Sequence, residues 1–196
     1  EGAGEDAMSY VPVINGRRVH MQGFNWTPVR QLYGRENKAA YDKRVGLVKR
    51  SGGNFLRVWG GGILEREYFY DLCDKYGMIV WAEIPYISHH MPEGNANTFS
   101  QMEELIAQNY NHPCICMWGI SNEITINGIT DDLLENHHIL NDLAHEMDPT
   151  RLTTMAVVSM CDMNEAYVQI PDTVSYNHYF GWYGGDTTMN GPWFDE

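Results

Sequence analysis

Positive charge is scarce in this chain. Only 13 Lys and Arg stand against 26 Asp and Glu in 196 residues, which gives a net charge of -13 at pH 7. Phosphate backbones repel such a chain, so we expect no nucleic acid partner. Long apolar runs are also missing: none approaches the roughly 20 residues that a membrane-spanning helix needs, so we expect no membrane partner.

A secretory leader is not visible either, because residues 1–6 (EGAGED) are acidic. We therefore expect a cytoplasmic location in a bacterium. The chain does not begin with Met, so its natural start can lie upstream, and export stays open.

Cysteine is limited to Cys73, Cys114, Cys116 and Cys161. Cys114 and Cys116 alternate on an expected strand and therefore share a face. A zinc site normally needs a C-x2-C spacing and further ligands. We predict reduced cysteines that pack in the core rather than a metal or redox pair.

Nucleotide-binding loops are absent. Gly60-Gly61-Gly62 follows an expected strand, but it lacks the G-x-G-x-x-G order and the Gly-Lys-Ser/Thr of a P-loop. A self-contained doubly wound nucleotide-binding sheet stays a structural alternative that no motif supports.

Strands and helices alternate along the chain, which is typical of an α/β protein with a parallel sheet. The expected helices are residues 37–51, 65–76, 98–110 and 131–147. The expected strands are residues 19–25, 54–59, 78–84, 114–121, 152–159 and 173–178. A complete (β/α)8 TIM barrel takes about 250 residues. We predict such a barrel, of which about six β/α units are present in residues 19–196.

Residues 1–18 differ in composition from the rest. They are acidic and Gly-rich at first, and Ile14-Asn15-Gly16-Arg17 is typical of a hairpin turn. We treat residues 1–18 as a lead-in segment.

The most informative stretch is NHPCICMWGISNE at residues 111–123. A short apolar run typical of a buried strand ends at the polar pair Asn122-Glu123, and α/β barrels present catalytic carboxylates at the carboxyl ends of their strands. The stretch resembles the acid/base motif of glycoside hydrolase family 2, which contains β-galactosidases, β-glucuronidases and β-mannosidases. The resemblance implies a carbohydrate-cleaving TIM barrel, entered from an upstream β-sandwich through residues 1–18.

The resemblance also implies roles in retaining hydrolysis of terminal β-D-glycosides. Glu123 becomes the general acid/base, and Asn122 the hydrogen-bond partner of the sugar 2-hydroxyl. Arg57, inside an apolar strand, matches an Arg that pairs with the nucleophilic Glu. The alternative for Arg57 is an ion pair with Glu83, which resembles a carboxylate at the end of the third strand.

Residues 175–183 (SYNHYFGWY) resemble the family's sixth-strand motif. Tyr179 matches a Tyr that hydrogen-bonds the nucleophile, while Trp182 and Tyr183 are expected to shape the sugar site. Aromatic core packing is the alternative, above all for Trp182.

A metal site is only partly matched. β-Galactosidases of the family bind magnesium through a Glu-x-His motif and the acid/base Glu. His89 matches that His, but Ile87 stands in place of the Glu. We therefore expect no required cofactor and assign His89 to the cleft as a sugar-contacting or supporting residue.

The nucleophile of the family follows the seventh strand in a Glu-Tyr-Gly or Glu-Phe-Gly context, which does not occur before Glu196. We expect the isolated chain to be inactive, and its unpaired edge strands to favour oligomers. The expected activity is that of a β-galactosidase, with β-mannosidase and β-glucuronidase as alternatives. A non-catalytic carbohydrate-binding fragment and an unrelated α/β enzyme also stay open.

Overall fold

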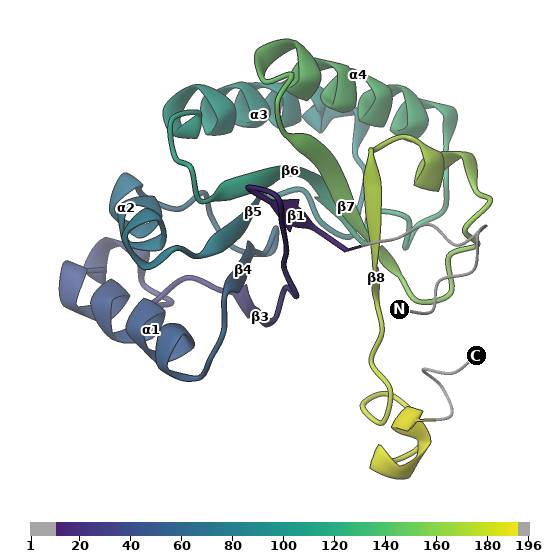
Figure 1. The fold of residues 1–196 in the computed structure, drawn as a ribbon. Helices are drawn as coiled ribbons and strands as arrows, with labels where there is room; N and C mark the ends of the chain where they lie inside the picture. Colours follow the sequence, from purple (N-terminus) through teal and green to yellow (C-terminus); the bar gives the residue numbers. More distant parts are fainter. Residues whose placement is uncertain (1–10, 192–196) are drawn as a thin grey trace.

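The computed structural model describes residues 11–191. Its centre is a curved sheet of six strands, all parallel, that follow one another in chain order (Figure 1). The strands are β3 (Gly23–Trp26), β4 (Phe55–Val58), β5 (Ile79–Glu83), β6 (Ile115–Asn122), β7 (Leu152–Val158) and β8 (Thr173–Asn177). Sequential parallel order and curvature are the features predicted for a partial barrel.

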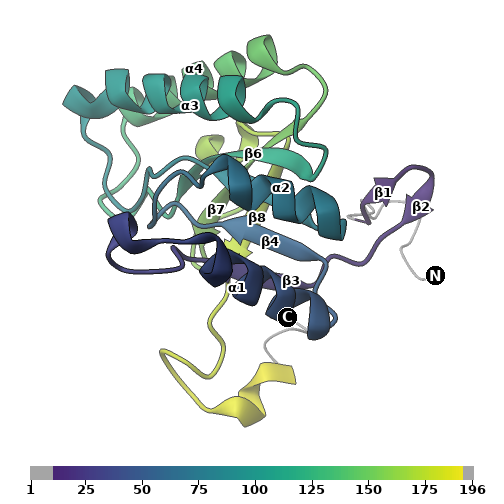
Figure 2. The same cartoon turned by 90° about the vertical axis from the view of Figure 1, so that its left-hand side faces the viewer.

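Four helices connect the strands and cover the outer face of the sheet, as Figures 1 and 2 show. They are α1 (Lys38–Arg50), α2 (Glu67–Tyr76), α3 (Asn95–Asn109) and α4 (Asp131–Met147). Between β7 and β8 the described chain forms only a short 3-10 helix, Ala166–Gln169. The six predicted strands are present, and four of their connections carry an α-helix.

Polar side chains mark where the helices begin. Asn37 accepts a hydrogen bond from the Ala40 N–H at the start of α1, and the Thr130 side chain accepts one from the Leu133 N–H at the start of α4. The predicted start of the third helix at residue 98 is wrong, because α3 begins at Asn95. A 3-10 helix, Pro92–Gly94, leads directly into α3, so the Thr98 hydroxyl lies inside the helix and donates to the Asn95 carbonyl.

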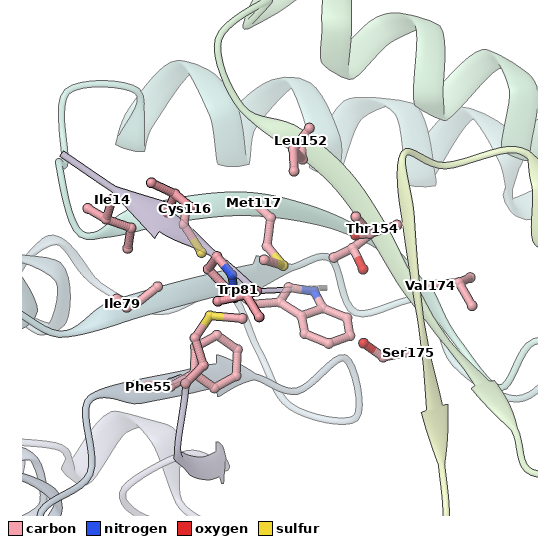
Figure 3. Close-up of a pocket in the computed structure, with 15 residues that line it drawn as sticks. Ile14, Phe55, Ile79, Trp81, Cys116, Met117, Leu152, Thr154, Val174 and Ser175 are labelled. Atoms are coloured by element: carbon pink, nitrogen blue, oxygen red, sulfur yellow. The ribbon is translucent and has the colours of Figure 1, made fainter. Parts of the chain in front are cut away.

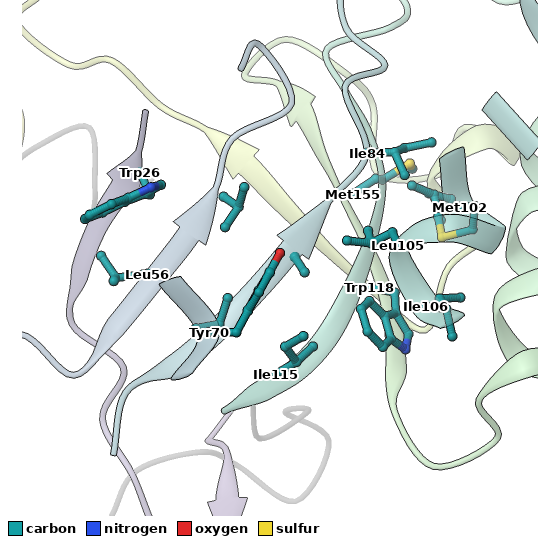
Figure 4. Packing of buried hydrophobic residues seen from close by; sticks show 14 of the residues in the cluster. Trp26, Leu56, Tyr70, Ile84, Met102, Leu105, Ile106, Ile115, Trp118 and Met155 are labelled. Atoms are coloured by element: carbon teal, nitrogen blue, oxygen red, sulfur yellow. The ribbon is translucent and has the colours of Figure 1, made fainter. Parts of the chain in front are cut away.

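The hydrophobic core lies between the sheet and the helices (Figure 4). Its largest fully buried side chains include Trp118, Tyr70 and Leu56. The Trp118 indole N–H donates to Asp148 at the end of α4, so this polar group is satisfied despite burial. The four cysteines are free, as predicted; Cys73 and Cys114 are buried, whereas Cys116 and Cys161 are only partly buried.

The predicted hairpin turn is confirmed by the antiparallel pair β1 (Val13–Ile14) and β2 (Arg17–Arg18). Residues 1–10 of the predicted lead-in lie outside the described residues. Beyond β8, the described chain leaves the sheet and extends away from it (Figures 1 and 2). Among residues 11–191, no helix is long and apolar enough to cross a membrane.

Candidate active site

An extra residue in β6 determines which side chains reach the concave face of the sheet. A side chain at Gly119 would lie on the same face of the sheet as those of Trp81 and Glu83 on β5, because a Cβ there would collide with both. Regular alternation would place Ser121 on the same face. The pairing instead jumps from Gly119 opposite Thr154 to Asn122 opposite Ala156. This bulge directs Ser121 outward to His137 on α4 and lets Asn122 join the side chains of the concave face.

Glu123 follows directly, at the carboxyl end of β6. Its φ of 50° lies in the left-handed region, where a non-glycine residue is held only by surrounding contacts. One such contact is the hydrogen bond from the Glu123 N–H to the Ala156 carbonyl, at 2.8 Å. The carboxylate Oε1 accepts from Asn177 Nδ2 at 2.8 Å and from the Tyr179 hydroxyl at 3.5 Å.

Arg57 and Glu83 form a buried ion pair beside this carboxylate. Arg57 Nε and Nη2 donate to the two Glu83 oxygens, each at 3.0 Å, and the Gly60 N–H adds a donor at 2.7 Å. The guanidinium also stacks 4.3 Å from the centre of the Trp81 ring. Burial raises the pKa of the Glu83 carboxyl to about 7, although Arg57 and Gly60 act to lower it. Of the two predicted partners of Arg57, Glu83 is the one it contacts.

Two asparagine amides connect this ion pair to Glu123. Arg57 Nη2 donates to Asn122 Oδ1 at 2.6 Å, and Arg57 Nη1 lies 3.5 Å from Asn177 Oδ1. Asn177 Nδ2 donates to Asn122 Oδ1 at 3.2 Å as well as to Glu123. The ends of β4, β5, β6 and β8 therefore share one hydrogen-bonded network. Asn177 was not among the predicted site residues, although it lies within the stretch 175–183.

The three predicted aromatic residues lie at different distances from this network. Tyr179 reaches Glu123, and burial together with the Glu123 charge raises the pKa of its phenol. Tyr183 touches Tyr179 edge to face, with ring centres 5.2 Å apart. Tyr183 and Trp182 are 80% and 78% exposed, so neither packs in the core of the described residues. Among the described residues, no hydrogen bond or ring contact joins the Trp182 side chain to the Glu123 network.

His89 lies on a segment that supports the site through its backbone. The Asn122 N–H donates to the Tyr86 carbonyl at 3.0 Å, and the Ser88 N–H donates to the Asn122 carbonyl at 3.1 Å. His89 itself is exposed and pairs through its backbone with Thr125. Its neighbour His90 is instead held between the Tyr86 hydroxyl and Asp132.

The residues that match the family's magnesium motif only in part do not fit a hard cation, which prefers several oxygen ligands. Ile87 offers an apolar side chain and pairs through its backbone with Asn122. Among the described residues, no three His, Cys, Asp or Glu side chains gather as a metal site.

One hollow on the same face of the sheet does not coincide with Glu123. It has a volume of about 640 Å³ and lies on the concave face at the amino-terminal halves of the strands (Figure 3). Apolar side chains such as Phe55, Ile79 and Met117 line most of it. Since α/β barrels place their chemistry at the carboxyl ends of the strands, we assign the site to Glu123 and not to this hollow.

Comparison with known proteins identifies the fold. A family model described as "Glycosyl hydrolases family 2, TIM barrel domain" matches residues 9–193. A β-glucuronidase of Bacteroides fragilis is 35% identical over 184 residues, covering 87% of this chain and 25% of that protein. β-Mannosidase B of Thermothelomyces thermophilus is 31% identical over 123 residues, covering 61% of this chain and 14% of that protein.

Solved structures agree in fold. The crystal structure of an FMN-binding β-glucuronidase from Faecalibacterium prausnitzii L2-6 has a TM-score of 0.84 and 42% identity, covering 92% of this chain and 28% of that one. A putative β-galactosidase from Bacteroides fragilis has a TM-score of 0.82 and 28% identity. The chain thus spans about a quarter of the length of the two β-glucuronidases, and the predicted partial TIM barrel is confirmed.

Proposed function

Because the chain belongs to the TIM barrel domain of the family 2 glycosyl hydrolases, we propose that the complete protein hydrolyses terminal β-glycosides with retention of configuration. The observation that carries the proposal is the Glu123 carboxylate, held at the carboxyl end of β6 by Asn177 and Tyr179. Glu123 protonates the departing oxygen in the first step and activates water in the second.

The neighbouring residues supply binding and support. The Arg57 and Asn177 donors occupy Asn122 Oδ1, which leaves the Asn122 amide N–H groups for a sugar hydroxyl. Arg57, which is itself held by Glu83, fixes the orientation of this amide. Tyr179 and Tyr183 form one aromatic wall, and exposed Trp182 and His89 are assigned to the outer rim of the cleft.

The nucleophile comes from another part of the protein. A retaining enzyme needs a second carboxylate about 5 Å from the first. Glu83 is the only other carboxylate in the network within the described residues, and both its oxygens are held by Arg57. We therefore assign the nucleophile to a residue outside the described chain and expect the isolated chain to be inactive.

The sugar we propose first is a β-D-glucuronide, and a β-mannoside second. The similarity to a β-glucuronidase over 87% of the chain favours this order over the β-galactoside expected from sequence. Arg57 is already paired with Glu83, so a glucuronate carboxylate requires a cationic partner from another segment. We propose a cytoplasmic enzyme with no metal requirement, since Ile87 replaces the expected ligand.

The test uses the complete protein with 4-nitrophenyl β-D-glucuronide, β-D-mannoside and β-D-galactoside in the presence of EDTA. We expect turnover of the glucuronide, and we expect Glu123→Gln to lower its kcat/KM by about 100-fold or more. Glu165→Gln, at an exposed position between β7 and β8, is the matched control and should retain activity. Sugar binding without turnover by the wild-type protein would favour the non-catalytic alternative instead.

A further inference from the structure

We infer that Asn177 is a positioning residue that holds Oε1 of Glu123 as an acceptor and thereby makes Oε2 the oxygen that carries the catalytic proton. The inference rests on the proposed function, because it assigns a microscopic role within that same site. It concerns which of two chemically equivalent oxygens performs the transfer.

The orientation of the Asn177 amide follows from its neighbours. A guanidinium only donates hydrogen bonds, so the atom of Asn177 that faces Arg57 Nη1 must be the carbonyl Oδ1. The amide nitrogen is then directed to the opposite side. There one N–H meets Glu123 Oε1 at 2.8 Å and the other meets Asn122 Oδ1 at 3.2 Å. Both donors of the amide are used.

Separate strands hold the two partners. Asn177 is the last residue of β8 and pairs with Val158 of β7, whereas Glu123 follows β6. The left-handed backbone at Glu123 is stabilised by its own hydrogen bond to Ala156. No described residue donates a hydrogen bond to Oε2 of Glu123, while Oε1 has both Asn177 and Tyr179 as donors.

This asymmetry determines the proton path. An oxygen that accepts two donors is poorly placed to carry a proton of its own, so the acid form of Glu123 holds its proton on Oε2. In the first step the Oε2–H bond breaks as the proton passes to the glycosidic oxygen, the bond from that oxygen to the anomeric carbon breaks, and the nucleophile bonds to the carbon. In the second step water adds to the carbon, displaces the nucleophile and returns a proton to Oε2.

The experiment compares substrates that differ in their need for an acid. A dinitrophenyl leaving group departs without protonation, whereas an alkyl leaving group requires it. In the complete protein, we expect Asn177→Ala to lower kcat/KM for an alkyl glycoside by about tenfold or more and to change the dinitrophenyl value by less than about threefold. We also expect the alkaline limb of the alkyl-glycoside pH profile to move to higher pH, because a donor to the carboxylate form is lost.

Two further variants make the test specific. Asn177→Asp nearly preserves the shape but places a carboxylate beside Glu123, so its alkaline limb should move further upward than that of Asn177→Ala. Ser175→Ala, two residues earlier on β8 and lining the remote hollow, should behave as wild type. Equal losses on both leaving groups, or an unchanged profile in Asn177→Asp, would overturn the inference.

Failure of the proposed function gives a different result. If the wild-type protein cleaves no aryl β-glycoside, the activity proposal fails while the positioning of Glu123 can still be measured. In that case a crystal structure of Asn177→Ala should show the Glu123 carboxylate rotated from its wild-type orientation. A carboxylate that keeps both oxygens in place without Asn177 contradicts the inference by itself.

Discussion

Arg57 is the residue on which most of the site contacts converge. Its guanidinium donates to Glu83 on β5, to Asn122 on β6 and to Asn177 on β8, and its plane lies over Trp81. A buried Glu left without its cation has an uncompensated charge, which is far more costly than losing an exposed ion pair. The contribution of Arg57 to the free energy of unfolding should therefore be measurable even in a chain that turns over no substrate.

We predict that Arg57→Met lowers the free energy of unfolding of the chain by about 3–5 kcal/mol, measured by urea denaturation. The double variant Arg57→Met/Glu83→Gln should recover part of that loss, because it no longer buries an unpaired carboxylate. Arg50→Met, at an exposed position of α1, serves as the control and should stay within about 0.5 kcal/mol of wild type. A double variant that is less stable than the single one would contradict this account.

The sequence was informative about individual residues where a charged or polar group interrupts an apolar strand. Arg57, Glu83 and the Asn122-Glu123 pair stand out in this way, and the structure brings all four together. Asn177 was missed because it is one polar residue among several in a Tyr-rich stretch. Its role depends on contacts with Arg57 on β4 and with Asn122 and Glu123 at the end of β6, and no local pattern encodes such distant neighbours.

At the scale of elements, strand β6 shows what apolar patterns predict and what they leave out. Its existence and its polar end follow from the sequence of residues 114–123. The bulge before Asn122 does not, because an extra residue is visible only through the pairing with β7. The start of α3 was misplaced for a related reason: Thr98 looks like a cap locally, but Pro92 already begins a helical turn upstream.

The bulge also creates a buried polar contact between β6 and α4. The His137 Nδ1–H donates to the Leu133 carbonyl, so Nε2 accepts from the Ser121 hydroxyl at 2.8 Å, and Ser121 in turn accepts from Tyr167 at 3.2 Å. This arrangement requires a neutral imidazole. Burial accordingly lowers the pKa of His137 to about 4.

This neutral His makes stability depend on pH. The unfolded chain binds a proton at His137 below about pH 6.5, while the folded chain does not until about pH 4. The stabilising contribution is thus present above pH 6.5 and is lost as pH falls towards 4. Between pH 7 and pH 5 we expect His137 to account for a fall of about 2 kcal/mol in the free energy of unfolding.

Urea denaturation at pH 7 and at pH 5 gives the fall in the free energy of unfolding between the two pH values. The difference in this fall between wild type and His137→Gln is the contribution of His137. His20→Gln is the control, because His20 is exposed and is not among the groups that lower the pKa of His137; its replacement should leave the His137 contribution unchanged. If His137→Gln loses stability at low pH as steeply as wild type, the assignment to His137 is wrong.

For the whole molecule, the important feature is a curved sheet whose two faces differ in what covers them. Helices cover the outer face (Figure 2), whereas the concave face contains the site at one end and the apolar hollow of about 640 Å³ at the other. Among the described residues, β3 and β8 each pair on one side only. Unpaired parallel strands beside an apolar hollow favour association with other chains.

We therefore predict that the chain, prepared by itself, forms concentration-dependent oligomers in analytical ultracentrifugation. Phe24 lies on edge strand β3 with 52% of its surface exposed, so Phe24→Lys should shift the distribution towards monomer by adding charge at that edge. Met160→Lys makes a comparable change at a position that is 82% exposed but lies in the loop after β7, outside both edge strands, and should leave association unchanged. A monodisperse wild-type monomer, or an equal effect of the two substitutions, would show that the strand edges do not drive association.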